Sequence, residues 1–147
     1  MKKNKTINLY SLIKNKSSFP AIQLRSSLNA GGFIRQFYSS DIDIYESFYM
    51  ITLNRNNITT GVVKIGQGGC AETSVDIKLI SHYAIQSLAQ GVILFHNHPS
   101  GNILPSKQDL KITEKIKNCL KVFDIDLLDH VIVSSDEYHS MADNGEI

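Results

Sequence analysis

The chain has 147 residues, of which 42% are hydrophobic and 20% are charged, and its formal net charge is +1. This length and balance predict a single globular domain with a real core, and they exclude a chain too polar to fold. A near-neutral charge gives no global basic field, so charge does not support nucleic acid as a partner. No apolar run in the sequence approaches the roughly 20 residues that cross a bilayer.

The first residues show little periodicity and carry several lysines. We predict a mobile N-terminal extension over residues 1–25 and one domain over residues 26–147. Cys70 and Cys119 lie far apart and belong to no Cys-x-x-Cys pair. We therefore expect reduced thiols in a cytoplasmic protein rather than the disulfide framework of a secreted one.

A helix and a hairpin are expected in the first half of the domain. Ser26 or Ser27 is a suitable N-cap for a helix with an apolar face formed by Leu28, Phe33, Ile34 and Phe37. A strand rich in aromatic and β-branched residues follows over 46–54. A turn at 55–57 then leads to a return strand over 58–65.

The second half alternates helices and strands. Ser74 is the expected cap of a helix in which apolar residues repeat at helical spacing, and Gly91 is placed near the end of that helix. A buried strand, a helix after Ser106, a strand over 127–133 and a last strand over 138–142 complete the order. Strands interleaved with helices predict an α/β domain whose sheet is covered by helices on both faces.

The most informative stretch is a His-x-His pair followed by Ser-x-x-Asp, formed by His96, His98, Ser106 and Asp109. The apolar run over residues 91–95 is typical of a buried strand. Side chains alternate along a strand, so the two histidines point the same way. Ser106 then opens a helix with Asp109 in its first turn. Two imidazoles and one carboxylate can therefore converge at a strand end, the open three-ligand arrangement of catalytic zinc sites.

A purely structural interpretation of the same residues stays open. Ser-x-x-Asp before an apolar-periodic segment resembles a capping box, in which Ser106 and Asp109 only cap a helix. A His-x-His pair can equally be two ordinary strand residues. The two interpretations of Asp109 are compatible, because the helix dipole favours a carboxylate at a helix N-terminus and would orient it as a ligand.

At these residues the chain resembles the JAB/MPN metalloprotease family, often called JAMM. The positions that match its signature are His96, His98, Ser106 and Asp109. The bacterial RadC-like branch is matched further by the strings His96-Asn97-His98-Pro99-Ser100-Gly101-Asn102 and Leu127-Leu128-Asp129-His130. The likeness runs from about Ser26 to the C-terminus. It implies a mixed β-sheet sandwiched by helices, an architecture that is also cytidine-deaminase-like, in agreement with the order of elements.

The resemblance also assigns a role to Glu46. From sequence alone, Glu46 is a solvated acid at the start of a strand. The family has a glutamate at this place as its general base, whereas Asp41 and Asp43 precede the strand and do not match the motif.

The resemblance implies a Zn²⁺ ion bound by His96, His98 and Asp109, with a water in the fourth position whose pKa falls from near 16 to about 7. Glu46 would take the proton of this water and deliver it to a leaving amine. Ser106 would donate a hydrogen bond to the developing oxyanion. The implied activity is hydrolysis of a peptide or isopeptide bond in a protein or peptide substrate.

We expect a short form without the helix-hairpin-helix region of long RadC-like proteins, so no DNA-binding role of that region is transferred. Eukaryotic deubiquitinating relatives carry insertions that hold ubiquitin, and because the spacing here is short, the resemblance does not imply ubiquitin specificity. The alternative function is an accessory role in DNA repair or DNA metabolism without peptidase activity, suggested by the historical name of the group. It predicts nucleic-acid binding that weakens as salt rises.

The other histidines are weaker candidates. His130 precedes an apolar strand segment and is typical of a buried, hydrogen-bonded structural histidine, although a place near the site stays open. His82 in a helix and His139 in a polar tail have no convincing ligand partner, so we expect neither to bind a metal.

Overall fold

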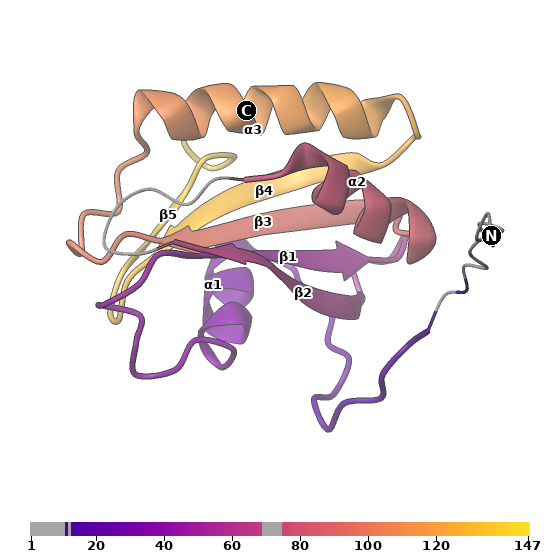
Figure 1. Ribbon diagram of the computed structural model, residues 1–147, viewed down its shortest axis with the longest axis horizontal. Coiled ribbons are helices and arrows are strands. Elements are labelled where there is room, and N and C mark those ends of the chain that lie inside the picture. The colour runs from indigo at the N-terminus through magenta and orange to yellow at the C-terminus, as the bar shows by residue number, and fades with distance from the viewer. Residues whose placement is uncertain (1–10, 12, 69–74) are drawn as a thin grey trace, which may run out of the picture.

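The computed structural model describes residues 11, 13–68 and 75–147, which form a mixed five-stranded sheet with helices on both faces (Figure 1). The strand order is β2-β1-β3-β4-β5. The strands are β1 (Ser47–Leu53), β2 (Thr59–Gln67), β3 (Gly91–Asn97), β4 (Asp126–Val133) and β5 (Tyr138–Ser140). Among the strands that the structure describes, β3 and β4 pair in parallel and the other three pairings are antiparallel. This is the α/β class that the sequence predicts.

The helices form the two outer layers. Helix α1 (Ser27–Arg35) covers one face, while α2 (Ile77–Gln86) and α3 (Lys107–Lys121) cover the other (Figure 1). Helix α3 is the crossover between the parallel strands β3 and β4, which cannot be joined by a tight turn. In the described part of the chain, no helix has the length and apolarity that a membrane span requires.

Strand β3 supplies side chains to both cores. All seven of its residues are buried, as are all seven of β1, because both strands lie inside the sheet with helices on either side. Leu94 packs into the core beneath α2 and α3, together with Ile116. Phe95 points the other way and packs with Ile34 of α1. Full burial of such a side chain contributes about 1.5–3 kcal/mol, so these two cores fix the position of β3.

Several predicted helix boundaries need correction. Ser26 does cap α1, and its side chain accepts a hydrogen bond from the Asn29 N–H, but Leu28 is 62% exposed and does not belong to the buried face. Helix α2 is capped by Asp76, whose carboxylate accepts a hydrogen bond from the Lys78 N–H. The predicted cap, Ser74, lies outside the described residues.

The prediction that Gly91 lies near the end of α2 is wrong. The helix ends at Gln86, and Leu88 adopts the left-handed conformation after it, with φ of 54°. Gly91 is instead the first residue of β3. A Cβ atom there would lie 3.2 Å from the Leu128 side chain, so close packing between β3 and β4 accounts for the glycine.

Part of the predicted N-terminal extension packs on the sheet. The Leu24 N–H donates to the Asn57 carbonyl and the Thr59 N–H donates to the Ile22 carbonyl, both at 2.9 Å. Leu24 itself is buried. Residues 1–10, on which most of the predicted mobility rests, lie outside the described residues, as does Cys70. The Cys119 thiol is free and half-buried.

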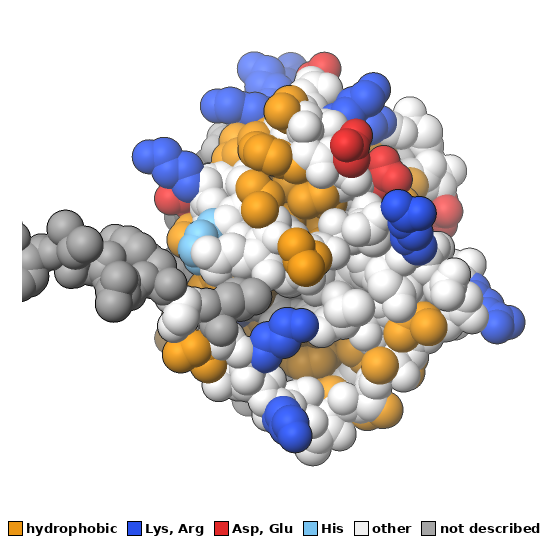
Figure 2. All heavy atoms as spheres, turned by 90° about the vertical axis from the view of Figure 1, so that its right-hand side faces the viewer, with side chains coloured by type: hydrophobic (Ala, Val, Ile, Leu, Met, Phe, Trp, Pro, Cys, Tyr) orange, Lys and Arg blue, Asp and Glu red, His pale blue; other side chains and the backbone are white. Residues whose placement is uncertain are grey.

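The end of the molecule at which α2 and α3 terminate is rich in exposed apolar side chains. Figure 2 shows these side chains gathered on that face. Leu88, after α2, and Val122 and Phe123, after α3, are exposed large apolar residues. The histidine pair lies at the opposite end of β3, where the strand leads into the loop before α3.

Candidate metal centre

Two histidines and an aspartate meet where β3 ends and α3 begins. His96 is the penultimate residue of β3 and His98 follows its last residue. Asp109 lies in the first turn of α3, which starts from the same edge of the sheet after the connecting loop. The carboxyl edge of parallel strands is the usual place for a site in sheets of this kind, because loops and helix N-termini meet there.

The three side chains present their ligand atoms to one another. The Nε2 atoms of His96 and His98 are 2.8 Å apart. Asp109 Oδ1 lies 3.3 Å from His96 Nε2, and Asp109 Oδ2 lies 3.4 Å from His98 Nε2. All the ligand atoms of this group lie within 4.8 Å of one another. The structure therefore unites the three residues that the motif singled out.

The hydrogen bonds of His98 determine which of its nitrogens carries a proton. His98 Nδ1 lies 2.6 Å from the Asn102 carbonyl oxygen, which can only accept. Nδ1 must therefore be the protonated nitrogen. In the neutral imidazole this leaves Nε2 with a lone pair directed at Asp109.

A buried chain of hydrogen bonds fixes His96 in the same way. Thr113 donates its hydroxyl hydrogen to the Asp109 carbonyl at 2.5 Å, so His130 Nδ1 must donate to the Thr113 oxygen at 2.6 Å. Complete burial lowers the pKa of His130 well below its ordinary value, so this ring is neutral and its Nε2 accepts. His96 Nδ1 lies 2.8 Å from that atom and must donate to it. His96 Nε2 is then an acceptor as well.

Acceptors therefore crowd together, and such a group attracts a cation. The pKa of His98 is raised, chiefly by its hydrogen bond to Asp109. Burial would raise the pKa of Asp109, but hydrogen bonds with His96 and His98 outweigh it and hold that pKa well below its usual range. The raised pKa means that His98 becomes positively charged more readily beside Asp109, and the lowered pKa keeps the Asp109 carboxylate ionised. Two imidazole nitrogens and a carboxylate oxygen are a ligand set that suits Zn²⁺, with a fourth position left for water or substrate.

Ser106 and Asp109 also form the capping box that the sequence indicates. The Ser106 hydroxyl accepts from the Asp109 N–H at 3.0 Å, and Asp109 Oδ2 accepts from the Ser106 N–H at 2.7 Å. The capping interpretation is thus correct for both residues. It does not compete with a ligand role, because the same bonds hold the Asp109 carboxylate toward the histidines. The Ser106 hydroxyl keeps its own hydrogen for donation.

Asn97, between the two histidines, holds the segment that carries Glu46. Its side chain points to the α1 side, where its carbonyl accepts from the Ser47 N–H at 2.8 Å. Its amide donates to the Tyr45 carbonyl at 2.7 Å and also to the Ile42 carbonyl. These bonds fix the backbone on both sides of Glu46, which directly precedes β1.

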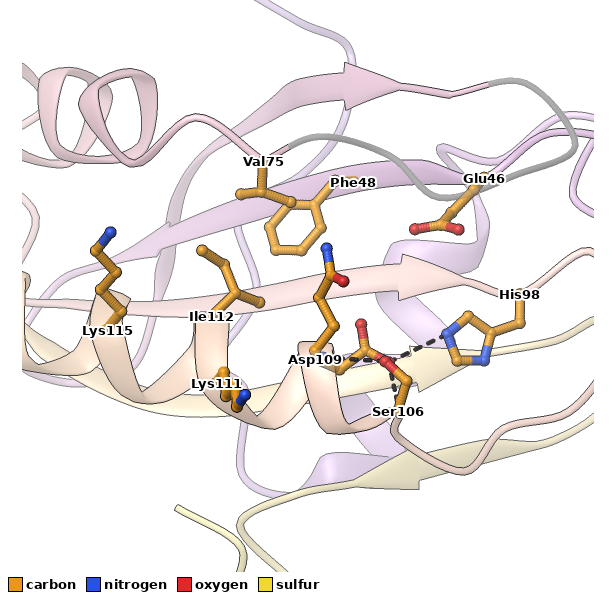
Figure 3. Close-up of a pocket in the computed structure, with 10 residues that line it drawn as sticks. Glu46, Phe48, Val75, His98, Ser106, Asp109, Lys111, Ile112 and Lys115 are labelled. Carbon is orange, nitrogen blue, oxygen red and sulfur yellow. Dashed lines mark hydrogen bonds and ion pairs between the residues drawn. The ribbon is translucent and has the colours of Figure 1, made fainter.

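A pocket of about 380 Å³ opens beside the three ligand residues. Glu46 lies on one wall, and His98, Ser106 and Asp109 lie on the other (Figure 3). The Glu46 carboxylate points into the space between β1 and the first turn of α3 (Figure 3). The structure thus gathers all five residues named from the motif, with His96 buried behind His98.

Three residues of this site were not predicted as part of it. Asn97, Thr113 and His130 act through hydrogen bonds that cross between elements. The alternation along β4 was the available signal for His130, because it places that side chain on the α3 face beside His96. His139 pairs with Glu146 at 2.8 Å and His82 is exposed on α2, so the described structure gives neither a place in the metal group.

Comparison with known proteins places the chain in a family. A model of the family described as "RadC-like JAB domain" matches residues 24–146. A "UPF0758 protein" of Flavobacterium johnsoniae is 39% identical over 101 residues, which are 69% of this chain and 44% of that protein. Proteins of the same name from Porphyromonas gingivalis and Clostridium botulinum are each 38% identical, over 101 and 102 residues. These matches include 68% and 69% of this chain, and 44% and 45% of the respective relatives. The chain therefore spans less than half the length of the curated relatives that it matches. The chain belongs to the RadC-like JAB domain family.

Proposed function

We propose that this protein is a zinc-dependent hydrolase that cleaves a peptide or isopeptide bond. The observation that carries the proposal is the convergence of His96 Nε2, His98 Nε2 and the Asp109 carboxylate beside a pocket. When the two imidazoles are neutral, their hydrogen bonds at Nδ1 leave the converging Nε2 atoms without protons, as metal ligands must be. Capping a helix needs only Ser106 and Asp109, so it does not account for the two histidines.

The ligand residues are held before any ion arrives. His96 is fixed through His130, His98 through the Asn102 carbonyl and Asp109 through the Ser106 N–H. Such partners of metal ligands typically contribute 10- to 100-fold in affinity, because they fix the ring orientation and the tautomer. A bound Zn²⁺ ion would supply a water of lowered pKa and polarise the carbonyl under attack.

Glu46 and Ser106 are the proposed catalytic residues. From the wall opposite Asp109, Glu46 would accept a proton from the attacking water and return it to the leaving amine. Ser106 would donate its hydroxyl hydrogen to the oxygen on which negative charge develops. One such donor is worth roughly 3 kcal/mol in the transition state.

Replacing Glu46 tests the proposed base. Glu46→Gln keeps the size of the side chain but cannot accept the proton, so turnover should fall by about 100-fold or more while zinc binding persists. The measurements are zinc content after gel filtration and cleavage of a peptide library followed by mass spectrometry.

Asp43→Asn is the matched control, because Asp43 precedes the same strand but its carboxylate bonds to Ser135 and it does not line the pocket. This variant should cleave at the wild-type rate. Equal turnover by Glu46→Gln would reject the proposed base. A zinc-loaded wild-type protein that cleaves no member of the library would reject the peptidase itself.

A further inference from the structure

The pocket beside the metal centre continues along α3 as a groove. Four residues of the helix line it, at spacings of three and four residues that place them on one helical face: Gln108, Lys111, Ile112 and Lys115. The opposite wall is formed by Phe48 and Val75 (Figure 3). A chain lying in the groove would therefore pass from the metal ligands to a pair of lysines.

Part of the groove wall is apolar. Phe48 is 2% exposed and stacks on His96, with the two ring planes 9° apart. Ile112 and Val75 are half-buried and face it from the two walls (Figure 3). The exposed parts of Ile112 and Val75 favour an apolar side chain of the substrate in the groove, because it would remove their surface from water.

Two lysines of α3, on either side of Ile112 in the sequence, make the groove basic. Lys111 and Lys115 are four residues apart on the same helix, where like charges repel each other. Neither ammonium group forms an ion pair with a carboxylate of the described residues. Zinc would offset the charges of Asp109 and Glu46, so the two lysines would leave the loaded groove positive. An anion placed between the lysines would relieve their repulsion.

We infer that the substrate carries a carboxylate two to three residues from the scissile bond, held by Lys111 and Lys115. This inference rests on the proposed hydrolase function. The helix rise puts Lys115 about 9 Å along the axis from Asp109. An extended peptide advances about 3.3 Å per residue, so this distance corresponds to two or three residues. The carboxylate is that of an aspartate or glutamate side chain or that of the peptide C-terminus.

The test uses pools of acetylated octapeptides that contain glutamate, or glutamine in its place, at one fixed position. The zinc-loaded wild-type protein is assayed for cleavage, and zinc-loaded Glu46→Gln is assayed for binding by fluorescence anisotropy. We expect glutamate pools to be favoured by roughly three- to tenfold in both assays at low salt, since exposed ion pairs are weak and screened. Lys111→Gln/Lys115→Gln should abolish the preference. Lys117→Gln/Lys121→Gln, with the same charge change on the same helix outside this groove, should retain it.

The outcomes separate the inference from the function it rests on. The inference is overturned, even if cleavage is efficient, when the glutamate and glutamine pools are cleaved and bound equally well. It is also overturned when the glutamate preference persists in Lys111→Gln/Lys115→Gln. Absence of cleavage from every pool overturns the hydrolase, whereas a lysine-dependent glutamate preference in the anisotropy assay would still establish recognition of the carboxylate. Amidated peptides distinguish its two sources, because amidation removes only the carboxylate of the C-terminus.

Discussion

The two sides of the end of β3 show different uses of buried polar residues. On the α1 side, the Asn97 amide meets two carbonyls and one N–H, so each of its groups bonds to a partner of the opposite kind. On the α3 side, His96 is satisfied at Nδ1, but its Nε2 faces another imidazole nitrogen and a carboxylate. Of these two adjacent residues of β3, Asn97 thus has a hydrogen-bond partner for each polar group, whereas His96 Nε2 lies among other acceptor atoms.

We propose that this difference separates a structural residue from a candidate ligand residue. Buried polar groups in a folded chain normally find partners, because leaving one unpaired costs about 1–3 kcal/mol. Asn97 obeys that rule within the chain itself. The nitrogen and oxygen atoms around His96 face one another, and a bound cation would pair them, so we propose that the first network serves folding and the second group serves binding. Three substitutions test this assignment.

The largest effect is expected from Asp109→Asn. Asparagine still accepts the Ser106 N–H through its carbonyl, but it removes the negative charge from the acceptor group. Zinc affinity should fall by about 1000-fold, or about 4 kcal/mol. Competition with a chromophoric chelator measures this loss, and cooperative thermal unfolding shows that the variant is folded. A variant that binds zinc as tightly as the wild type would remove Asp109 from the ligand set.

A smaller effect, on stability rather than on zinc, is expected from Asn97→Ala. The change strips hydrogen bonds from the backbone around Glu46 and should cost about 3 kcal/mol of unfolding free energy. Thermal denaturation of the metal-free protein measures it, with a decrease of roughly 10 °C for a domain of this size. Ser135→Ala, which removes only an exposed bond to Asp43, should change stability by less than about 0.5 kcal/mol. A stable Asn97→Ala protein with lost zinc binding would reverse our assignment of the two sides.

The smallest effect is expected from Thr113→Val. Valine has nearly the same shape but cannot accept the proton of His130 Nδ1, so the hydrogen bonds that fix His96 lose their anchor. Zinc affinity should decrease by about 10-fold. Thr60→Val, which removes a hydroxyl on β2 that bonds to Thr52, serves as the control and should bind zinc normally. Unchanged zinc affinity in Thr113→Val would show that the tautomer of His96 is set in some other way.

Local sequence patterns predicted much of this fold. The apolar run before His96 and the alternation of helices and strands are properties of neighbouring residues, and they gave the correct class and the correct position of α3. The capping box was equally visible, since Ser106 and Asp109 are three residues apart. Two predictions about the ends of α2 were wrong. The start of the helix required a choice between several suitable caps, of which Asp76 is the one used. The role of Gly91 depends on its contact with Leu128 of the neighbouring strand.

Local patterns could not establish which residues form hydrogen bonds to the site, although alternation along β4 indicates the face of His130. His130 reaches His96 because β3 and β4 pair in parallel with Leu94 opposite His130, a register that no short pattern specifies. Thr113 joins them because α3 turns that residue inward. Asn97 stands inside the motif, yet its role depends on a segment more than 50 residues earlier in the chain.

The Asp109 carboxylate both caps α3 and belongs to the candidate metal group, so binding of an ion would affect the motion of the backbone at the start of the helix. Its Oδ2 accepts the Ser106 N–H that begins α3, so an ion that immobilises this oxygen also restrains the opening of the first turn. Hydrogen–deuterium exchange at the Ser106 amide would then slow on loading, and this one proton would report occupancy without a substrate or a chromophore.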